Sequence, residues 1–123
     1  MVLNITNHPL AQWSMEQLQA ATEIGDEVVD LQFPNIPSSY SEEDIQREAL
    51  YYFNKVLQLN PIAVVVQGEF SFTFALVSML KKGGIPCYAA CSERCSTEEV
   101  QPDGTVLKKS HFKFVRFREY TTC

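Results

Sequence analysis

The residues best placed for chemistry stand at the end of the first predicted strand. Asn7-His8-Pro9 follow a short β-type run, and a helix begins almost at once. Ligands in open α/β sheets collect beyond the carboxyl ends of the strands. Histidine changes its charge near neutral pH, so His8 could transfer a proton or bind an anion there, with Asn7 beside it as a ligand-binding residue. The alternative is that His8 is a turn residue with a solvated ring.

A second polar group closes the third predicted strand, at Gln67-Gly68-Glu69. Glycine lets a backbone approach a ligand closely, and the free amides at the start of the following helix suit an anion. Glu69 is a second candidate catalytic residue, although an acid at this place is also simply favourable to the helix dipole. Gln67 could hydrogen-bond a base edge or merely close the loop.

Ser92 and Arg94 follow the fourth predicted strand and could donate hydrogen bonds to phosphate oxygens. Arg94 could equally pair with Glu93 or with an acidic helix. If the strand order is 2-1-3-4, strands one and three are neighbours at the topological switch point. The three loops, around His8, Gly68 and Arg94, are then expected to converge at one edge of the sheet.

The pattern that positions these residues alternates strands with helices and predicts a single α/β domain over residues 1–123. Ser14 and Gln17 form an S-x-x-Q capping box, and Gly25 supplies the stop of the first helix. The continuously apolar run at 62–66 is typical of a central parallel strand covered on both faces. We predict strands at Val2–Thr6, Glu27–Phe33, Ile62–Val66 and Pro86–Ala90, with helices at about 14–24, Ser41–Leu59 and Ser71–Lys82.

The last third of the chain changes character. Two β-like stretches, Ser96–Val100 and Thr105–Phe117, flank the turn sequence Gln101-Pro102-Asp103-Gly104. They predict an antiparallel hairpin appended to a mostly parallel sheet of order 2-1-3-4. The final strand mixes aromatic and basic side chains on both faces, which fits a ligand or subunit boundary or, alternatively, an edge strand protected by charge. The only tryptophan, Trp13, precedes the first helix and is expected to pack on Leu18, with stacking on a base as the alternative.

Composition and charge narrow the functional classes. The net charge is −5, with residues 1–60 at −7 and residues 61–123 at +2, which argues against binding long DNA or RNA but leaves a small anionic ligand open. We find no membrane span and no signal peptide, and expect a cytoplasmic protein. The clustered cysteines lack the second ligand pair of a zinc site, so we expect no metal, no other cofactor and reduced thiols at Cys87, Cys91, Cys95 and Cys123.

Several familiar signatures are absent from the sequence. There is no G-x-G-x-x-G after the first strand, no G-x-x-x-x-G-K-[ST], no H-E-x-x-H and no G-x-S-x-G. A nicotinamide dehydrogenase, a P-loop NTPase and an α/β-hydrolase are therefore disfavoured.

The opening Leu3–Leu10, followed by Ser14-Met15-Glu16-Gln17-Leu18, resembles the N/S-H-P/K-L … E-Q opening of small CRISPR-associated Rossmann-like proteins of type III systems. The segments Gln67-Gly68-Glu69 and Phe114–Tyr120 are similar to proteins of the same group. These single-domain relatives of CARF domains include ring nucleases, which cleave cyclic oligoadenylate messengers. The resemblance implies a Rossmann-like three-layer fold.

The resemblance also implies a homodimer that binds a cyclic oligoadenylate over its two-fold axis. Cleavage in such enzymes needs no metal, because a ribose 2′-OH attacks the neighbouring phosphate. His8 would then be a general acid or base, while Arg94 and the amides around Gly68 would hold the phosphate.

Three hypotheses stand after the sequence. The first is a metal-independent ring nuclease, which is favoured by the titratable group His8 at the predicted edge of the sheet. The second is a module of the same fold that senses or sequesters a nucleotide without cleaving it. The third is a plain α/β domain that binds a protein partner through its mixed final strand.

Overall fold

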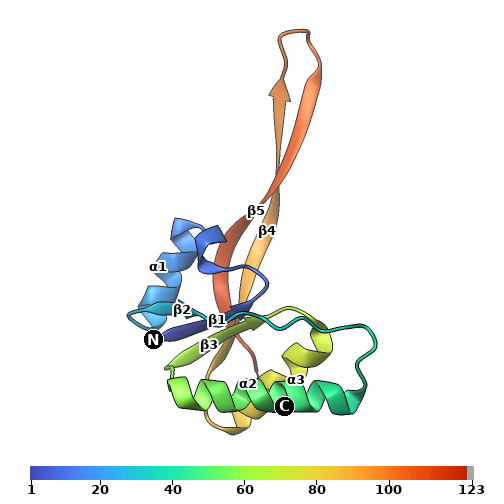
Figure 1. Cartoon of the computed structure of the whole chain (residues 1–123). Helices are drawn as coiled ribbons and strands as arrows, with labels where there is room; N and C mark the ends of the chain where they lie inside the picture. Colours follow the sequence, from blue (N-terminus) through green and yellow to red (C-terminus); the bar gives the residue numbers. More distant parts are fainter. Residues whose placement is uncertain (122–123) are drawn as a thin grey trace.

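A computed structural model describes residues 1–121 of the chain. Over these residues the protein is a mixed α/β fold in which helices cover both faces of a five-stranded sheet (Figure 1). None of the helices in this range is long and apolar enough to cross a membrane. In chain order the elements are β1 (Val2–Thr6), the short 3-10 helix η1 (Leu10–Gln12), α1 (Met15–Ile24), β2 (Val28–Asp30), α2 (Glu42–Leu59), β3 (Ala63–Gln67), α3 (Phe70–Lys82), β4 (Cys87–Val100) and β5 (Val106–Glu119).

The sheet has the order β2-β1-β3-β4-β5. Strand β1 pairs in parallel with β2 and β3, and β3 pairs in parallel with β4. The predicted order 2-1-3-4 is thus part of the observed order. Strand β5 runs antiparallel to β4 and extends the same sheet, so the order predicted for the sheet was incomplete.

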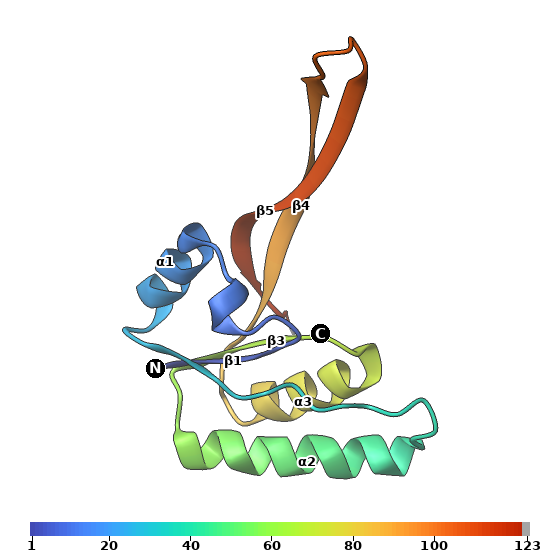
Figure 2. The same ribbon diagram turned by 45° about the horizontal axis from the view of Figure 1, so that its top comes forward.

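Two apolar layers hold the helices to the sheet. Successive side chains of a strand point to opposite faces, and β1 and β3 bury both sets. Helices α2 and α3 pack on one face and α1 lies on the other (Figure 2). The first layer includes Leu3, Ile5, Val64, Val66, Val56, Phe72 and Leu76, and the second includes Val2, Val65, Ala21, Trp13 and Phe117.

Local capping explains where α1 and α2 begin. The Ser14 hydroxyl accepts a hydrogen bond from the Gln17 amide at 3.2 Å, which is the first half of the predicted box. Gly25 is the C-cap of α1, as predicted. Ser41 and Asp44 form a complete capping box at α2, and the hydrogen bond from the Ser41 amide holds the pKa of Asp44 below its ordinary value.

The end of the fourth strand was predicted wrongly. Strand β4 does not stop at Ala90 but continues through Ser92 and Arg94, which were predicted to lie in a loop. The polar sequence stays extended because β5 pairs with it from Tyr88↔Glu119 to Val100↔Val106. Strands four and five are therefore the two halves of one long hairpin. The predicted antiparallel hairpin is confirmed, because β5 closely matches Thr105–Phe117 and pairs across the predicted turn, but Ser96–Val100 is the distal end of β4 and not a separate strand.

The second strand is shorter than predicted. Strand β2 covers Val28–Asp30, whereas the alternating pattern predicted Glu27–Phe33. Leu31 still donates its amide to the Asn4 carbonyl at 2.9 Å, and Leu31 and Phe33 pack against the core. The alternation of apolar and polar residues therefore reflects burial of these side chains and not continued strand pairing.

The distal half of the hairpin projects away from the body (Figures 1 and 2). We call residues 94–112 the arm. Its side chains are mostly exposed, and charged pairs cross between its strands, with Lys109 Nζ at 3.0 Å from Glu99 Oε2 and Lys108 Nζ at 3.9 Å from Glu98 Oε1. Exposed charges on edge strands discourage pairing with other chains.

Candidate functional site

A buried amide organises the end of β1. Asn4 is 2% exposed and makes three side-chain hydrogen bonds. Its Nδ2 donates to the His8 carbonyl and to Asp30 Oδ1, both at 2.9 Å, and its Oδ1 accepts from the Thr6 hydroxyl at 2.8 Å. The Asp30 carboxylate also accepts from the Leu10 amide at 3.2 Å. This network joins β1 and β2 to the turn that carries His8.

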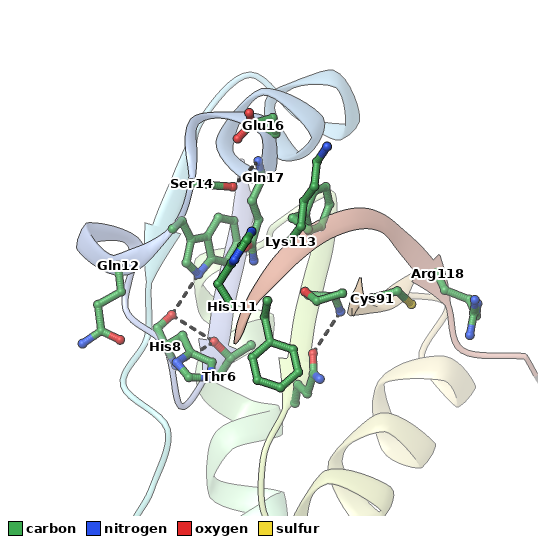
Figure 3. A pocket seen from close by; sticks show the side chains of 16 residues that line it. Thr6, His8, Gln12, Ser14, Glu16, Gln17, Cys91, His111, Lys113 and Arg118 are labelled. Carbon is green, nitrogen blue, oxygen red and sulfur yellow. Dashed lines mark hydrogen bonds between the residues drawn. The ribbon is translucent and has the colours of Figure 1, made fainter. Parts of the chain in front are cut away.

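The backbone of His8 is held from three sides. Its carbonyl accepts from Asn4 and from Trp13 Nε1, both at 2.9 Å, and it shares the one proton of the Thr6 hydroxyl, at 3.1 Å, with Asn4 Oδ1 (Figure 3). The His8 residue itself is exposed. The turn is therefore fixed at its main chain while the imidazole stays accessible, which suits a side chain that must meet a ligand.

Trp13 ties this turn to the last strand. Its ring is 8% exposed and lies 5.8 Å, centroid to centroid, from the ring of Phe117. Leu18 packs against the same cluster, as the predicted contact requires. Trp13 also lines the cavity described next, so its role in stacking on a base stays a prediction.

A cavity of about 860 Å³ lies beside the His8 turn. The end of β1, η1, the first turn of α1, the end of β3 and the lower part of the hairpin all contribute to its wall (Figure 3). Polar and charged side chains are frequent there. They include His8, Glu16, Gln67, Ser92, His111, Lys113 and Arg118.

The structure brings together three of the seven predicted site residues. His8, Gln67 and Ser92 line the cavity. Gln67 reaches across to β4, where its Oε1 accepts from the Ala90 amide at 3.0 Å. Ser92 lies on β4 opposite Phe114 instead of in a loop. The predicted convergence of strands one and three is thus present, with a strand as the third wall.

The other four residues lie off the cavity wall. Asn7 is exposed in the turn, and Arg94 lies farther along β4, with its guanidinium 3.2 Å from the Ser110 hydroxyl. At Gly68 a Cβ atom would lie 2.4 Å from the Phe33 ring. The need for glycine there comes from this aromatic contact, so it gives no sign of a ligand.

Glu69 caps helix α3. Its carboxylate accepts from the Ser71 amide at 2.8 Å and from the Phe72 amide at 3.0 Å. The Ser71 hydroxyl also donates to it and, with these amides, lowers the pKa of Glu69. The helix amides that were expected to bind an anionic ligand are therefore already bonded to the Glu69 carboxylate.

Three basic or titratable cavity residues on β5 were missed. His111, Lys113 and Arg118 line the cavity, although the mixed composition of this strand had suggested a ligand boundary. A β-bulge explains in part why these residues were not predicted to line the site. Cys91 pairs with Arg116 and Ser92 with Phe114, so Val115 is extra and the alternation of faces breaks. Phe114 and Phe117 accordingly touch, with ring centroids 4.9 Å apart.

The charges of the cavity favour an anion. Lys113 and Arg118 supply two cations against the single carboxylate of Glu16. This local balance contrasts with the net charge of −5 of the whole chain. A compact anionic ligand fits these charges better than a long nucleic acid, which needs an extended basic surface.

The cysteines are free thiols where the structure describes them. Cys87 is buried, and burial raises its pKa to about 12, so it remains protonated. Cys91 and Cys95 are half-buried, and Cys91 lines the cavity. Cys123 lies outside the described residues. Within residues 1–121 no group of three or more His, Cys, Asp or Glu is placed to hold a metal ion.

We expect Asn4→Ala to lower the free energy of unfolding by about 2–3 kcal/mol, because the His8 carbonyl and the Asp30 carboxylate lose a buried donor. Urea unfolding followed by circular dichroism measures this loss. The control is Asn7→Ala in the same turn, an exposed position where we expect a change within about 0.5 kcal/mol. Equal losses in both variants would contradict the role of the network.

We expect the stabilising effect of Glu69 to depend on pH. Because its pKa is lowered in the folded state, ionised Glu69 stabilises the fold above its ordinary pKa of 4.5, and this stabilisation is lost as pH falls through the folded-state value. Glu69→Gln should therefore be less stable than wild type at pH 7, by up to about 1 kcal/mol, and equal to it near pH 3. Thermal melts from pH 3 to 7 test this, and a constant difference would refute it.

Comparison with known proteins places the chain among its relatives. No curated protein and no solved structure gives a significant match. One family does match, over residues 1–118, which is nearly the whole chain and includes every residue of the cavity wall. The chain thus belongs to the family described as the uncharacterized protein MJ1673 family.

Proposed function

We propose that this protein is a metal-independent ring nuclease that binds and cleaves a cyclic oligoadenylate of type III CRISPR defence. The observation that carries the proposal is the cavity at the carboxyl ends of β1 and β3, where His8, Lys113 and Arg118 surround a space of about 860 Å³. The proposal includes a Rossmann-like, CARF-related assignment of the α/β fold and a cytoplasmic location.

The cavity chemistry matches phosphodiester cleavage by a neighbouring ribose. The 2′-oxygen attacks the phosphorus, its bond to phosphorus forms and the bond to the 5′-oxygen breaks. The products are a 2′,3′-cyclic phosphate and a 5′-hydroxyl. The protein must hold the phosphate in line and stabilise its charge, for which Lys113 and Arg118 supply cations and Ser92 and Gln67 supply polar groups. His8 would transfer a proton.

The structure changes two of the roles expected from sequence. Lys113 and Arg118 take the phosphate-binding role first given to Arg94 and to the amides near Gly68, because they line the cavity and those groups do not. Glu69 is left as the cap of α3, since its carboxylate is engaged by Ser71 and Phe72. His8 keeps its proposed catalytic role.

One observation favours the second candidate, a module that binds the nucleotide without cleaving it. The cavity wall holds one carboxylate, Glu16, and the acid expected to assist catalysis is used as a helix cap. Binding needs only the cations and polar groups that remain. The two candidates differ in whether the bound ligand is recovered intact.

A homodimer forms part of the proposal. A groove of about 950 Å³ runs along α3, where Phe70 is 90% and Phe74 is 76% exposed. Such exposure of large apolar side chains marks interaction sites. Gln67 lines both this groove and the cavity, so a second copy seated on α3 would lie next to the site. Each copy carries its own cavity, so a dimer suits a cyclic ligand with repeated units.

The first prediction of this proposal concerns turnover. With EDTA present, wild-type protein should convert cyclic tri-, tetra- or hexa-adenylate into linear products with cyclic-phosphate ends, as followed by chromatography. His8→Ala should slow this at least about 100-fold. Lys113→Gln should weaken ligand binding about tenfold, whereas the matched control Arg94→Gln, outside the cavity, should not.

The other outcomes of this experiment are equally informative. Intact ligand that co-elutes with the protein would support the binding module and refute the nuclease. Absence of binding to all three rings would refute both nucleotide hypotheses and leave the partner-binding domain.

The second prediction concerns the dimer. Phe74→Glu should shift the chain from dimer to monomer in light scattering coupled to gel filtration, with the dimer dissociation constant raised at least about 30-fold, because a charge replaces a contact at the centre of the groove. Leu50→Glu is the matched control, since Leu50 is 50% exposed on α2. A wild-type monomer, or equal effects of the two variants, would exclude this interface.

A further inference from the structure

We propose that His111 is the second proton-transfer group of the cavity and that it works with His8 as an acid–base pair. This inference rests on the proposed nuclease function and adds to it a catalytic residue on the last strand. The two residues lie near opposite ends of the chain, so only the fold brings them to one cavity.

The position of both histidines carries the inference. The chain has two histidines, and both line the same cavity. His8 comes from the turn after β1, while His111 comes from β5, where it pairs with Cys95 of β4. The cavity wall thus receives one imidazole from the central part of the sheet and one from its edge hairpin (Figure 3).

Both residues are anchored at the main chain and open at the side chain. The carbonyl of His8 accepts three hydrogen bonds, and His111 lies within the antiparallel β4–β5 ladder. Both residues are exposed, so each ring is accessible to a ligand. Fixed backbones with accessible rings are the arrangement that proton transfer at a defined phosphate requires.

The proposed reaction moves a proton at each of two oxygen atoms. One neutral imidazole takes the proton from the 2′-OH as the 2′-oxygen–phosphorus bond forms. The other, protonated, imidazole gives its proton to the 5′-oxygen as the phosphorus–oxygen bond breaks. Atoms and charge balance, and the pair ends with its protonation states exchanged. A later proton exchange with water restores the starting state.

Other charged and titratable side chains line the cavity beside the two histidines. Glu16 of α1, Cys91 of β4, and Lys113 and Arg118 of β5 line the same cavity, and Cys95 lies across the ladder from His111. The proposed reaction uses one protonated and one neutral imidazole among these charged groups.

The test is a pH–rate profile under single-turnover conditions on the cyclic adenylate that wild type cleaves. Wild type should give a bell-shaped profile, because one group must be neutral and the other protonated. His111→Gln should lower the rate at least about 100-fold and remove one limb of the bell, with ligand affinity changed less than about threefold. Ser110→Ala, next to it on β5 and outside the cavity wall, is the matched control and should keep both limbs.

A modified substrate separates the two roles. A linkage with a 5′-bridging sulfur has a leaving group that needs no proton, so it should restore the rate of the variant that lacks the acid. If the rate is restored in His111→Gln, His111 is the acid. If it is restored in His8→Gln, His8 is the acid and His111 is the base. Restoration in neither would overturn the pair.

Two failures can be told apart. If wild type cleaves and His111→Gln keeps the wild-type rate and profile, the inference about His111 is wrong and the nuclease proposal stands. If wild type binds the ring and does not cleave it, both are wrong. Circular dichroism of His111→Gln confirms folding, which an exposed strand position is expected to preserve.

Discussion

The buried side-chain amide of Asn4 is the interaction on which the site depends. It has no access to water, so each of its polar atoms must find a partner within the fold. Those partners belong to β2, to the end of β1 and to the following turn, through Asp30, Thr6 and the His8 carbonyl. A different path of the chain after β1 would leave buried polar atoms unpaired. The position of His8 is therefore determined by the energetics of the sheet interior.

The parallel part of the sheet could be predicted because its signals are local. The continuous apolar run of β3, the caps at Ser14 and Ser41 and the stop at Gly25 each act within a few residues. The hairpin was predicted, but the continuation of β4 past Ala90 was not, because Ser92 and Arg94 are polar and stay extended through pairing with β5 about twenty residues farther along the chain. The bulge at Val115 then reverses which side chains of β5 point to each face of the sheet, and no residue type in the sequence predicts this bulge. The cavity wall formed by His111, Lys113 and Arg118 was missed for these two reasons.

Glu69 and Gly68 show a different limit of sequence reasoning. The start of a helix favours an anion whether it is a ligand or a side chain of the same protein, and a glycine permits close approach of a ligand or of an aromatic ring. The sequence motif is the same in each case. Only the contacts of the Glu69 carboxylate with Ser71 and Phe72, and of Gly68 with Phe33, decide between them. Because both groups are already engaged by the chain itself, the candidate site lies on the α1 side of this edge of the sheet and not on the α3 side.

Trp13 then explains how the two halves of the proposed site act together. Its indole N–H donates to the His8 carbonyl, and its ring packs on Phe117 of β5, the strand that carries His111. The contact is buried and fixes the base of the hairpin, from which the exposed arm that includes His111 extends. A single residue thus links the turn of one imidazole to the strand of the other. Displacement of the hairpin base would alter the spacing of the two histidines, so the geometry of the pair depends on packing in the α1 layer.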